Sequence, residues 1–356
     1  MLDSGNNLNA ARKAGRKSEA GLGKAAGFAA CFVGHERVTT SCAVTGWASE
    51  TNRPAKSRGG ATEFAFRGSG CILIALKQHK RISRRNFLGA LAVTGAAGVG
   101  YMRFWEPGWL QVGRHNIPIG KDRPPLSILQ LSDFHASSVV SLEQIAESVD
   151  MGLALKPDII CLTGDFITSK YDAFDDYAAV LKRLADNSPT FACLGNHDGG
   201  RWIGRRGYTD TSNIRSVLSK AGIRLLHNES TEISVGGRNL TMVGVGDLWA
   251  EELDAERAFA GVKPNPDSTT VLLSHNPDSK TDVAAHPWQV MLCGHTHGGQ
   301  LYLPLIGRPF APVRDKRFVT GLCPWNDRWI HITRGVGNLH GMRFNCPPEV
   351  SLISVC

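Results

Sequence analysis

From residue 126 to the C-terminus, short apolar runs alternate with stretches in which apolar positions recur at helical spacing. The short runs have the length of buried strands, and Ser141 with Gln144 has the spacing of a capping box at a helix start. Strands that alternate with helices favour a parallel sheet with right-handed crossovers. The elements expected in the first half of this region are strands at 126–131, 157–162 and 190–194 and helices at 141–155, 172–185 and 213–221.

After residue 221 the pattern becomes a series of short apolar runs with few helical stretches between them. Gly236 and Gly237 separate two of these runs and predict a tight hairpin. Two mixed sheets packed face to face, with helices outside, account for this order better than one open sheet, so the predicted fold class is α/β. The expected strands are 224–226, 232–235, 239–245, 271–273, 290–293, 329–333 and 350–355.

Composition changes this picture only near the N-terminus. The 356-residue chain has a net charge of +8, but residues 1–85 contain 15 Lys/Arg and 5 Asp/Glu, which leaves the remainder near −2. A near-neutral body lacks the basic surface of a general nucleic-acid-binding protein. Residues 1–75 are rich in small and basic residues without periodicity, and we expect a disordered leader there.

A basic stretch precedes a mildly apolar run between residues 76 and 105. The pair Arg84-Arg85 resembles a twin-arginine export signal, and an ordinary helix after basic residues is the alternative. Because such signals lie at the start of a protein, we expect translation to begin near Leu76 and the leader to be absent from the natural product. The run is short for a membrane span, so residues 76–105 are expected to act as a signal or an anchor, and residues 106–356 as the folded domain.

Side chains that can bind metal follow many of the apolar runs, at the points where strands are expected to end. The carboxyl ends of parallel strands form one binding edge, so we expect these side chains to converge. Five of the twelve histidines of the chain are among them. The candidates, in chain order, are Asp133, His135, Asp165, Asn196, His197, Asp198, His275, His295 and His297.

Singly, each candidate has a plainer explanation. Gly164-Asp165 is a common turn pair, and a lone His275 is more often a buried histidine bonded to backbone. His295 and His297 are two residues apart, so on extended backbone their imidazoles point the same way. The ordered series of carboxylates, imidazoles and one amide, each after an apolar run, therefore indicates a metal site.

These motifs resemble those of the calcineurin-like metallophosphoesterase superfamily over about residues 126–356. Gly294-His295-Thr296-His297-Gly298-Gly299-Gln300 resembles the bacterial membrane-associated branch, which includes twin-arginine-exported phosphodiesterases and UDP-2,3-diacylglucosamine pyrophosphohydrolases. The resemblance implies a four-layer αββα sandwich of two mixed sheets with a dinuclear metal centre. The ligands it implies are Asp133, His135 and His297 for the first ion, Asn196, His275 and His295 for the second, and Asp165 as the bridge.

Imidazole and carboxylate ligands suit Mn, Fe, Zn or Co, and a pair of such ions activates water for attack on a phosphate ester. The resemblance places His197 near the leaving group or the phosphate. We expect Asp198 to orient His197 and keep it protonated, so that it donates a proton to the leaving oxygen. The chain is therefore expected to be a metal-dependent phosphodiesterase or pyrophosphohydrolase. A phosphomonoesterase of the phosphoprotein phosphatase type is the alternative, and a non-catalytic metal-binding module is disfavoured because no motif residue is missing.

Two stretches bear on the substrate. Three arginines lie among aromatic residues after the third motif: Arg201, Arg205 and Arg206. They either bind a second phosphate or an anionic head group, or belong to a solvated surface loop, and the two explanations have equal weight. Residues 301–310 are apolar for a connection and face either the core or a lipid surface. Together with the export signal, they favour a membrane-lipid or nucleotide-linked substrate.

The same features set the expected partners and location. We expect contact with the twin-arginine export machinery and a membrane surface, and none with nucleic acid. The expected location is the periplasmic or envelope face of the inner membrane, with a cytoplasmic, membrane-associated location as the alternative. Trp249 is assigned to core packing ahead of a place at the site. No potential metal ligands are expected near four further histidines, His227, His286, His331 and His340.

Overall fold

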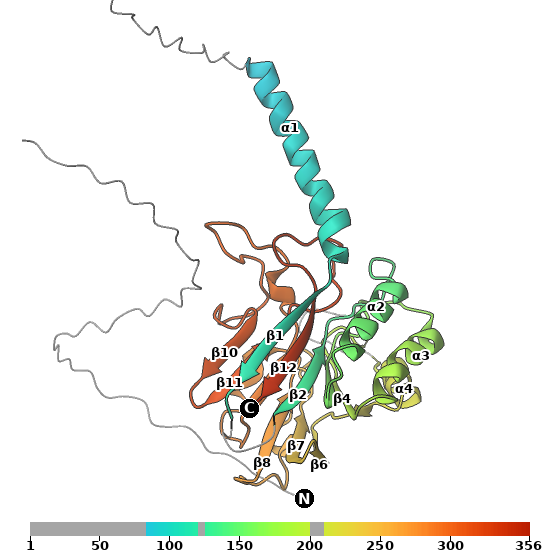
Figure 1. Ribbon diagram of the computed structural model, residues 1–356, viewed down its shortest axis with the longest axis vertical. Helices are drawn as coiled ribbons and strands as arrows, with labels where there is room; N and C mark the ends of the chain where they lie inside the picture. The colour runs from blue at the N-terminus through green and yellow to red at the C-terminus, as the bar shows by residue number, and fades with distance from the viewer. Residues whose placement is uncertain (1–82, 120–124, 200–209) are drawn as a thin grey trace, which may run out of the picture. The chain divides into compact units, whose positions relative to one another are not determined.

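The computed structural model describes residues 83–119, 125–199 and 210–356, and two six-stranded sheets form its core (Figure 1). The first sheet contains, in spatial order, β1 (Gln111–Ile117), β12 (Glu349–Val355), β2 (Leu126–Leu131), β3 (Ile159–Thr163), β4 (Thr190–Cys193) and β5 (Arg224–Leu225). The second contains β10 (Gly321–Trp325), β11 (Arg328–Ile332), β9 (Val290–Cys293), β8 (Ser268–Leu273), β7 (Arg238–Gly244) and β6 (Glu229–Val235).

Both sheets are mixed, as predicted. In the first sheet, β2, β3, β4 and β5 are parallel neighbours, and only the pairing of β12 with β2 is antiparallel. In the second sheet, β11, β9, β8 and β7 are parallel neighbours, with an antiparallel strand added at each edge. The parallel strands of each sheet therefore present their carboxyl ends at a common edge.

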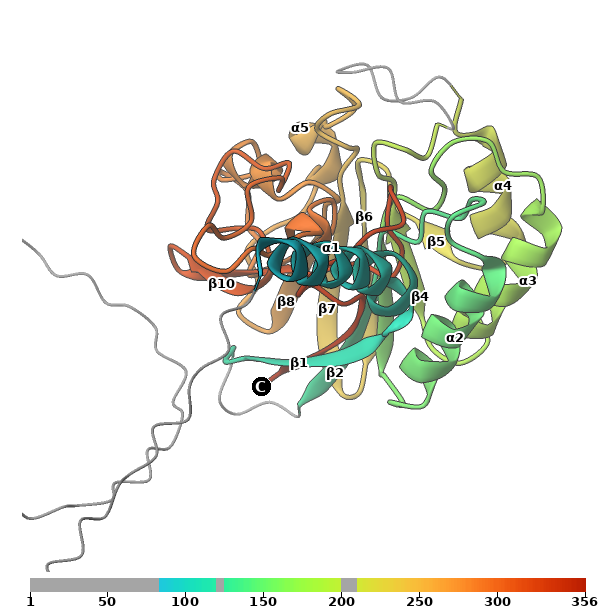
Figure 2. The same ribbon diagram turned by 90° about the horizontal axis from the view of Figure 1, so that it is seen from above.

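Helices cover the outer faces of the two sheets. Figure 2 shows α2 (Leu142–Leu153), α3 (Phe174–Ala185) and α4 (Ser212–Lys220) together on one side, where they pack on the first sheet. The outer face of the second sheet carries the short helices α5 (Ala255–Ala258) and η4 (Pro277–Thr281) with long connections. This order of layers confirms the predicted αββα sandwich.

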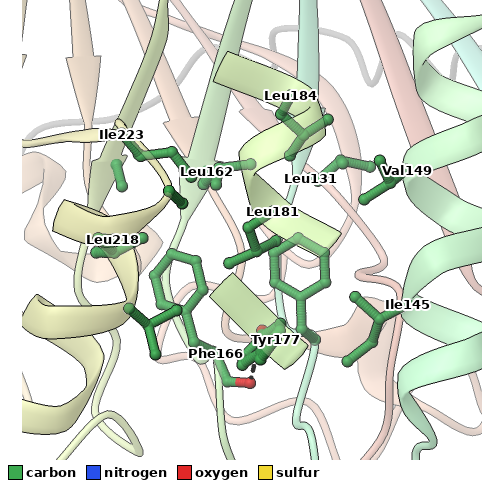
Figure 3. Close-up of a cluster of buried hydrophobic side chains, with 14 of the residues drawn as sticks. Leu131, Ile145, Val149, Leu162, Phe166, Tyr177, Leu181, Leu184, Leu218 and Ile223 are labelled. Atoms are coloured by element: carbon green, nitrogen blue, oxygen red, sulfur yellow. Dashed lines mark hydrogen bonds between the residues drawn. The ribbon is translucent and has the colours of Figure 1, made fainter. Parts of the chain in front are cut away.

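Three apolar clusters hold these layers together. The cluster between α2–α4 and the first sheet is drawn in Figure 3, where the Tyr177 hydroxyl donates a hydrogen bond to the Phe166 carbonyl at 3.0 Å. A second cluster fills the space between the two sheets, with Ile128 and Met242 from opposite sheets among its members. The third lies under α5 and includes Trp288. Buried aliphatic and aromatic area of this extent is the main stabilising contribution to the fold.

Local sequence signals explain where several elements begin. The Ser141 Oγ accepts a hydrogen bond from the Gln144 backbone N–H at 3.3 Å and caps α2, as the spacing predicts. Gly236 and Gly237 have φ of 58° and 75°, and they join β6 to β7 as the predicted hairpin. The predicted helices agree with α2, α3 and α4 to within two residues at each end.

Two edge strands, β1 and β10, are absent from the sequence-based expectation. Alternate residues of β1 are exposed, and the strand carries Gly113, Arg114 and Asn116. β10 contains Pro324, which an edge strand tolerates because one of its sides makes no ladder hydrogen bonds. Neither strand has the continuous apolar run by which the central strands are recognised.

The helical segment before the domain is longer than the sequence suggested. α1 (Arg84–Gly100), η1 (Tyr101–Trp105) and η2 (Glu106–Gly108) form one run of 25 residues, which is long and apolar enough to cross a membrane by length and composition. An N-terminal signal sequence meets the same criterion. The expected leader, residues 1–75, lies outside the described residues.

Candidate metal centre

The predicted ligands follow five strands of the two sheets. Asp133 and His135 follow β2, Asp165 follows β3, and Asn196 follows β4. In the second sheet, His275 follows β8, and the two histidines of the Gly294–Gln300 segment follow β9. β2, β3 and β4 are neighbours in one sheet, and β8 and β9 are neighbours in the other, so the structure brings the two groups together.

Five of these residues have left-handed backbone conformations, which non-glycine residues rarely adopt. Such residues cost about 1–3 kcal/mol each and concentrate at functional sites. Backbone hydrogen bonds hold two of them, from the Asp133 N–H to the Gly164 carbonyl at 2.9 Å and from the His135 N–H to the Asp165 carbonyl at 3.0 Å. The five are Asp133 (φ 53°), His135 (φ 50°), Asp165 (φ 55°), His295 (φ 69°) and His297 (φ 50°).

The four residues predicted for the first ion form one buried cluster. Asp133, His135, Asp165 and His297 each offer a ligand atom, and these atoms lie within 4.8 Å of one another. The His135 Nε2 is 3.0 Å from the His297 Nε2. It is also 3.4 Å from the Asp165 Oδ2, and the His297 Nε2 is 3.4 Å from the Asp133 Oδ1. Two imidazoles and two carboxylates therefore point at a single small volume.

The hydrogen bonds behind His135 prepare it as a ligand. The Thr168 hydroxyl donates to the His135 carbonyl at 3.2 Å, which leaves the Thr168 Oγ1 as an acceptor for the His135 Nδ1–H, also at 3.2 Å. In the neutral ring the Nε2 then carries a lone pair. A lone pair facing the His297 Nε2 at 3.0 Å suits a cation placed between the rings.

The three residues predicted for the second ion adjoin this cluster. The His275 Nδ1 donates to the Thr163 carbonyl at 2.7 Å, and its Nε2 lies 3.1 Å from the Asp165 Oδ2 without the alignment of a hydrogen bond. The His295 Nδ1 lies 2.9 Å from the Asn196 Oδ1. Asp165 thus lies between both groups, as a bridging ligand must.

Burial keeps most of these imidazoles neutral. It lowers the pKa of His135 and of His295 to about 3, and it lowers the pKa of His297 as well. The pKa of His275 differs: burial lowers it, but the carboxylates of Asp165, Asp133 and Asp247 together raise it above its usual value. Burial also raises the pKa of Asp133 to about 6. Neutral imidazoles beside buried carboxylates are the protonation states that divalent cations bind.

The residues present fit two divalent ions. The His275 Nε2 and the His295 Nε2 are buried and have no hydrogen-bond partner among the described residues. Such groups are costly unless a ligand satisfies them. Mixed imidazole, carboxylate and amide donors suit Mn, Fe, Zn or Co. The assignment of each residue to an ion stays a prediction.

A backbone carbonyl contacts the ring of the predicted acid, His197. The His197 Nδ1 lies 3.0 Å from the Thr168 carbonyl and can donate to it. The Asp198 carboxylate accepts hydrogen bonds from the backbone N–H groups of Gly195, Asp165 and Phe166, at 2.7, 3.1 and 2.6 Å. Asp198 therefore holds the loops around the site together, and its role in orienting His197 stays a prediction.

A cavity of about 670 Å³ opens at the predicted ligands. Trp249 lines it and packs edge-on against the His295 ring, with ring centroids 4.3 Å apart, so it has the place at the site that was ranked behind core packing. His340 also lines the cavity, and the sequence did not predict it there because no motif surrounds it. The other apolar residues that line the cavity are Leu301, Phe310, Pro312 and Leu339.

The turn before β12 supports Asp133 from behind. A Cβ on Gly335, which has φ 73°, would lie 2.6 Å from the Asp133 Cβ. Arg343 is fully buried and donates to the carbonyls of Arg334, Gly335, Gly337 and Cys346, with which it fixes the turn. The predicted substrate-binding residues Arg201, Arg205 and Arg206 lie outside the described residues.

Comparisons with known proteins agree with this geometry. Residues 126–299 match the family model described as calcineurin-like phosphoesterase. The chain is 45% identical to the phosphodiesterase YaeI of Escherichia coli over 282 residues, which cover 77% of this chain and 99% of that protein. It is 31% identical to the uncharacterized metallophosphoesterase YkuE of Bacillus subtilis, covering 78% and 98%. It is also 28% identical to the UDP-2,3-diacylglucosamine pyrophosphatase LpxG of Chlamydia trachomatis, covering 70% and 90%.

Proposed function

The chain belongs to the calcineurin-like phosphoesterase family, and we propose that its substrate is a phosphodiester or pyrophosphate linked to a membrane lipid. It is a hydrolase of phosphate esters that uses two divalent metal ions. The observation that carries the choice of substrate is the apolar lining of the cavity at the predicted ligands. Apolar walls of this kind can bury the apolar part of a substrate beside its phosphate.

The predicted ligands divide the chemistry between them. Two bound divalent ions supply a nucleophile near neutral pH and offset the charge of the phosphate. Asp165 lies between the two ligand groups and holds them at a fixed separation. Asn196 contributes an amide oxygen without a further negative charge that would repel the phosphate. His197 lines the cavity and gives its proton to the departing oxygen.

The cavity and the loop beyond it favour a substrate with an apolar part. Leu301 and Phe310 line the cavity, and between them Leu305 and Ile306 project into solvent. The Chlamydia relative is named for a pyrophosphate that joins a nucleotide to a diacylated sugar. A lipid with a phosphate at its polar end matches this site, because the phosphate can reach the predicted metal ligands and the apolar part can contact the cavity walls.

The domain is proposed to work at a membrane surface. Asn345 N–H donates to the Glu106 carboxylate at 2.9 Å, so the helical segment is attached beside residues 344–346. The same short segment binds the 301–310 loop, through the Tyr302 N–H and the Phe344 carbonyl at 2.8 Å. Exposed Phe104, Trp105 and Trp109 near the helix end suit the lipid headgroup region. Export by the twin-arginine route stays a prediction that cell fractionation can check.

A substrate panel tests the proposal with the full chain loaded with Mn²⁺. We expect turnover of bis-nitrophenyl phosphate and of a nucleotide-linked lipid pyrophosphate, and slower turnover of nitrophenyl phosphate. Faster turnover of the monoester would favour the phosphomonoesterase alternative. Turnover of the diester without any turnover of the lipid pyrophosphate would contradict the lipid part of the proposal alone.

The Asp165→Asn variant tests the metal centre itself. Loss of the bridging charge should lower activity by roughly 10³-fold and lower the bound metal measured by emission spectrometry. The matched control is Asp186→Asn, which makes the same change at an exposed surface ion pair with Lys182. An Asp165→Asn protein with normal metal content and normal activity would show that the bridge is assigned wrongly.

A further inference from the structure

A second group of potential metal ligands lies outside the predicted dinuclear centre. His115, His331 and Glu349 each offer a ligand atom, and these atoms lie within 4.8 Å of one another. The His115 Nε2 is 3.2 Å from the Glu349 Oε1, and the His115 and His331 ring centroids are 4.3 Å apart. His331 is fully buried, Glu349 is 4% exposed, and the His115 side chain is 21% exposed.

This group joins the two sheets. His115 lies in β1 and Glu349 begins β12, which are parallel neighbours in the first sheet. His331 lies in β11 of the second sheet. The neighbouring inter-sheet cluster is apolar, so an imidazole and a carboxylate at its margin are costly unless they are fully satisfied.

The hydrogen bonds of His331 leave one nitrogen ready for a ligand. Gln130 Nε2 donates to the Thr163 Oγ1 at 3.0 Å and to the Cys293 carbonyl at 2.9 Å, which fixes the orientation of the amide. The Gln130 Oε1 therefore accepts from the His331 Nδ1–H at 2.7 Å. The His331 Nε2 then carries a lone pair, and it is buried without a hydrogen-bond partner among the described residues.

The Glu349 carboxylate is held in place from the other side. Arg334 Nε donates to the Glu349 Oε2 at 2.8 Å, so the Oε1 is the oxygen that faces His115. Glycine at position 113 makes room for this arrangement, because a Cβ there would lie 1.9 Å from the Glu349 Oε1. Arg334 thus orients the carboxylate, as Gln130 orients the His331 imidazole. Supporting hydrogen bonds of this kind are typical behind metal ligands.

We propose that His115, His331 and Glu349 bind a third divalent transition-metal ion, which links the two sheets. The ion takes the place of the missing partner of the His331 Nε2. Two imidazoles and one carboxylate are a donor set that Zn²⁺ binds, with ligand distances of about 2.0–2.2 Å. Ligand atoms around such an ion lie about 3.3 Å apart, close to the His115–Glu349 separation of 3.2 Å. His115, the partly exposed member, is the one with room to adjust.

Counting metals tests this proposal independently of hydrolysis. The full chain is stripped with a chelator, dialysed against Zn²⁺ and measured by emission spectrometry. We expect three equivalents in the unaltered protein and two in His115→Gln. In an Asp165→Asn background, His115→Gln should again remove one equivalent. The proposal fails if His115→Gln binds as many equivalents as its parent in both backgrounds.

Further variants separate metal binding from folding. Gly113→Ala changes no ligand but displaces the Glu349 carboxylate, so it should also lose one equivalent while its circular dichroism stays unchanged. His286→Gln is the matched control, because His286 pairs with Glu256 at 3.7 Å and belongs to no group of three ligands among the described residues. It should keep all three equivalents, and loss of one equivalent in this control would overturn the assignment.

The link between the sheets gives a second readout. Zn²⁺ binds the folded protein and should raise its Tm. In the Asp165→Asn background, the Zn²⁺-dependent rise should be absent after His115→Gln and retained after His286→Gln. An equal rise with and without His115 would contradict a cross-sheet site.

Discussion

At the scale of single residues, the metal centre depends on side chains that are restrained before any ion binds. Asp133, Asp165 and His295 have left-handed backbones, and hydrogen bonds behind His135 and His275 select their tautomers. A restrained ligand loses less conformational entropy when the ion arrives. The backbone strain is therefore offset when metal is bound.

His197→Gln tests the proton donor. His197 lines the cavity, where its ring contacts the Thr168 carbonyl. Because His197 is not a predicted metal ligand, the metal content measured by emission spectrometry should stay unchanged. The kcat for substrates with an alkyl leaving group should fall by roughly 10²–10⁴-fold, because general acid catalysis contributes that much. The loss should be smaller for nitrophenyl esters, which leave without a proton.

The control for this prediction is His340→Gln, the same replacement at another residue that lines the cavity. It should show no dependence on the leaving group. A His197→Gln protein that loses its metals, or that loses activity equally on both kinds of ester, would contradict the proposed acid.

At the scale of elements, the site depends on how closely strand ends approach one another. A Cβ on Gly294, directly after β9, would lie 2.1 Å from the Ser132 Oγ and 2.4 Å from the Asp133 Oδ2 after β2. The neighbouring His295 N–H donates to the Asp133 Oδ1 at 3.0 Å. Glycine is thus required where the two sheets meet at the ligands.

Gly294→Ala should push the Asp133 carboxylate out of place while the strands stay paired. We expect metal affinity to fall by about 10–100-fold, as for loss of a supporting contact at a metal site. The affinity is measured by titrating the metal-free protein with Mn²⁺ and recording activity at each step, and circular dichroism checks the fold. Gly108→Ala is the control, because a Cβ there meets nothing within 4 Å. Equal Mn²⁺ affinities for both variants would refute this account of Gly294.

At the scale of the whole molecule, apolar surface is concentrated where the cavity opens and where the helical segment ends. Leu305 and Ile306 are 107% and 69% exposed. Two large apolar side chains exposed side by side are typical of a surface that contacts a lipid or a partner. The 25-residue helical run reaches the same region through Glu106. These features suit an enzyme that takes its substrate from a bilayer.

The double variant Leu305→Asp/Ile306→Asp tests the lipid surface. Both side chains are exposed, so the fold should be unaffected, and turnover of soluble bis-nitrophenyl phosphate should not change. Turnover of a lipid-linked substrate in vesicles should fall by about 10-fold, because two charges oppose insertion. Ala284→Asp/Ala285→Asp adds the same charges at exposed positions of another loop and should leave both rates unchanged. Equal vesicle activity in both double variants would argue against the loop.

The sequence by itself determined the central strands, the helices over the first sheet and the chemistry at the strand ends. Those features are local, because an apolar run and the polar residues after it are adjacent in the chain. Edge strands such as β1 escaped prediction because an exposed strand needs no apolar run.

Only the tertiary structure decided which side chains meet across the sheets. His115, His331 and Glu349 come from three strands, and His115 and Glu349 are 234 positions apart, so no spacing in the chain signals their contact. The contact between the His197 ring and the Thr168 carbonyl was likewise decided by loop packing. Contacts between sheets depend on how the layers pack, whereas hydrophobic periodicity reports only on neighbouring positions within one element.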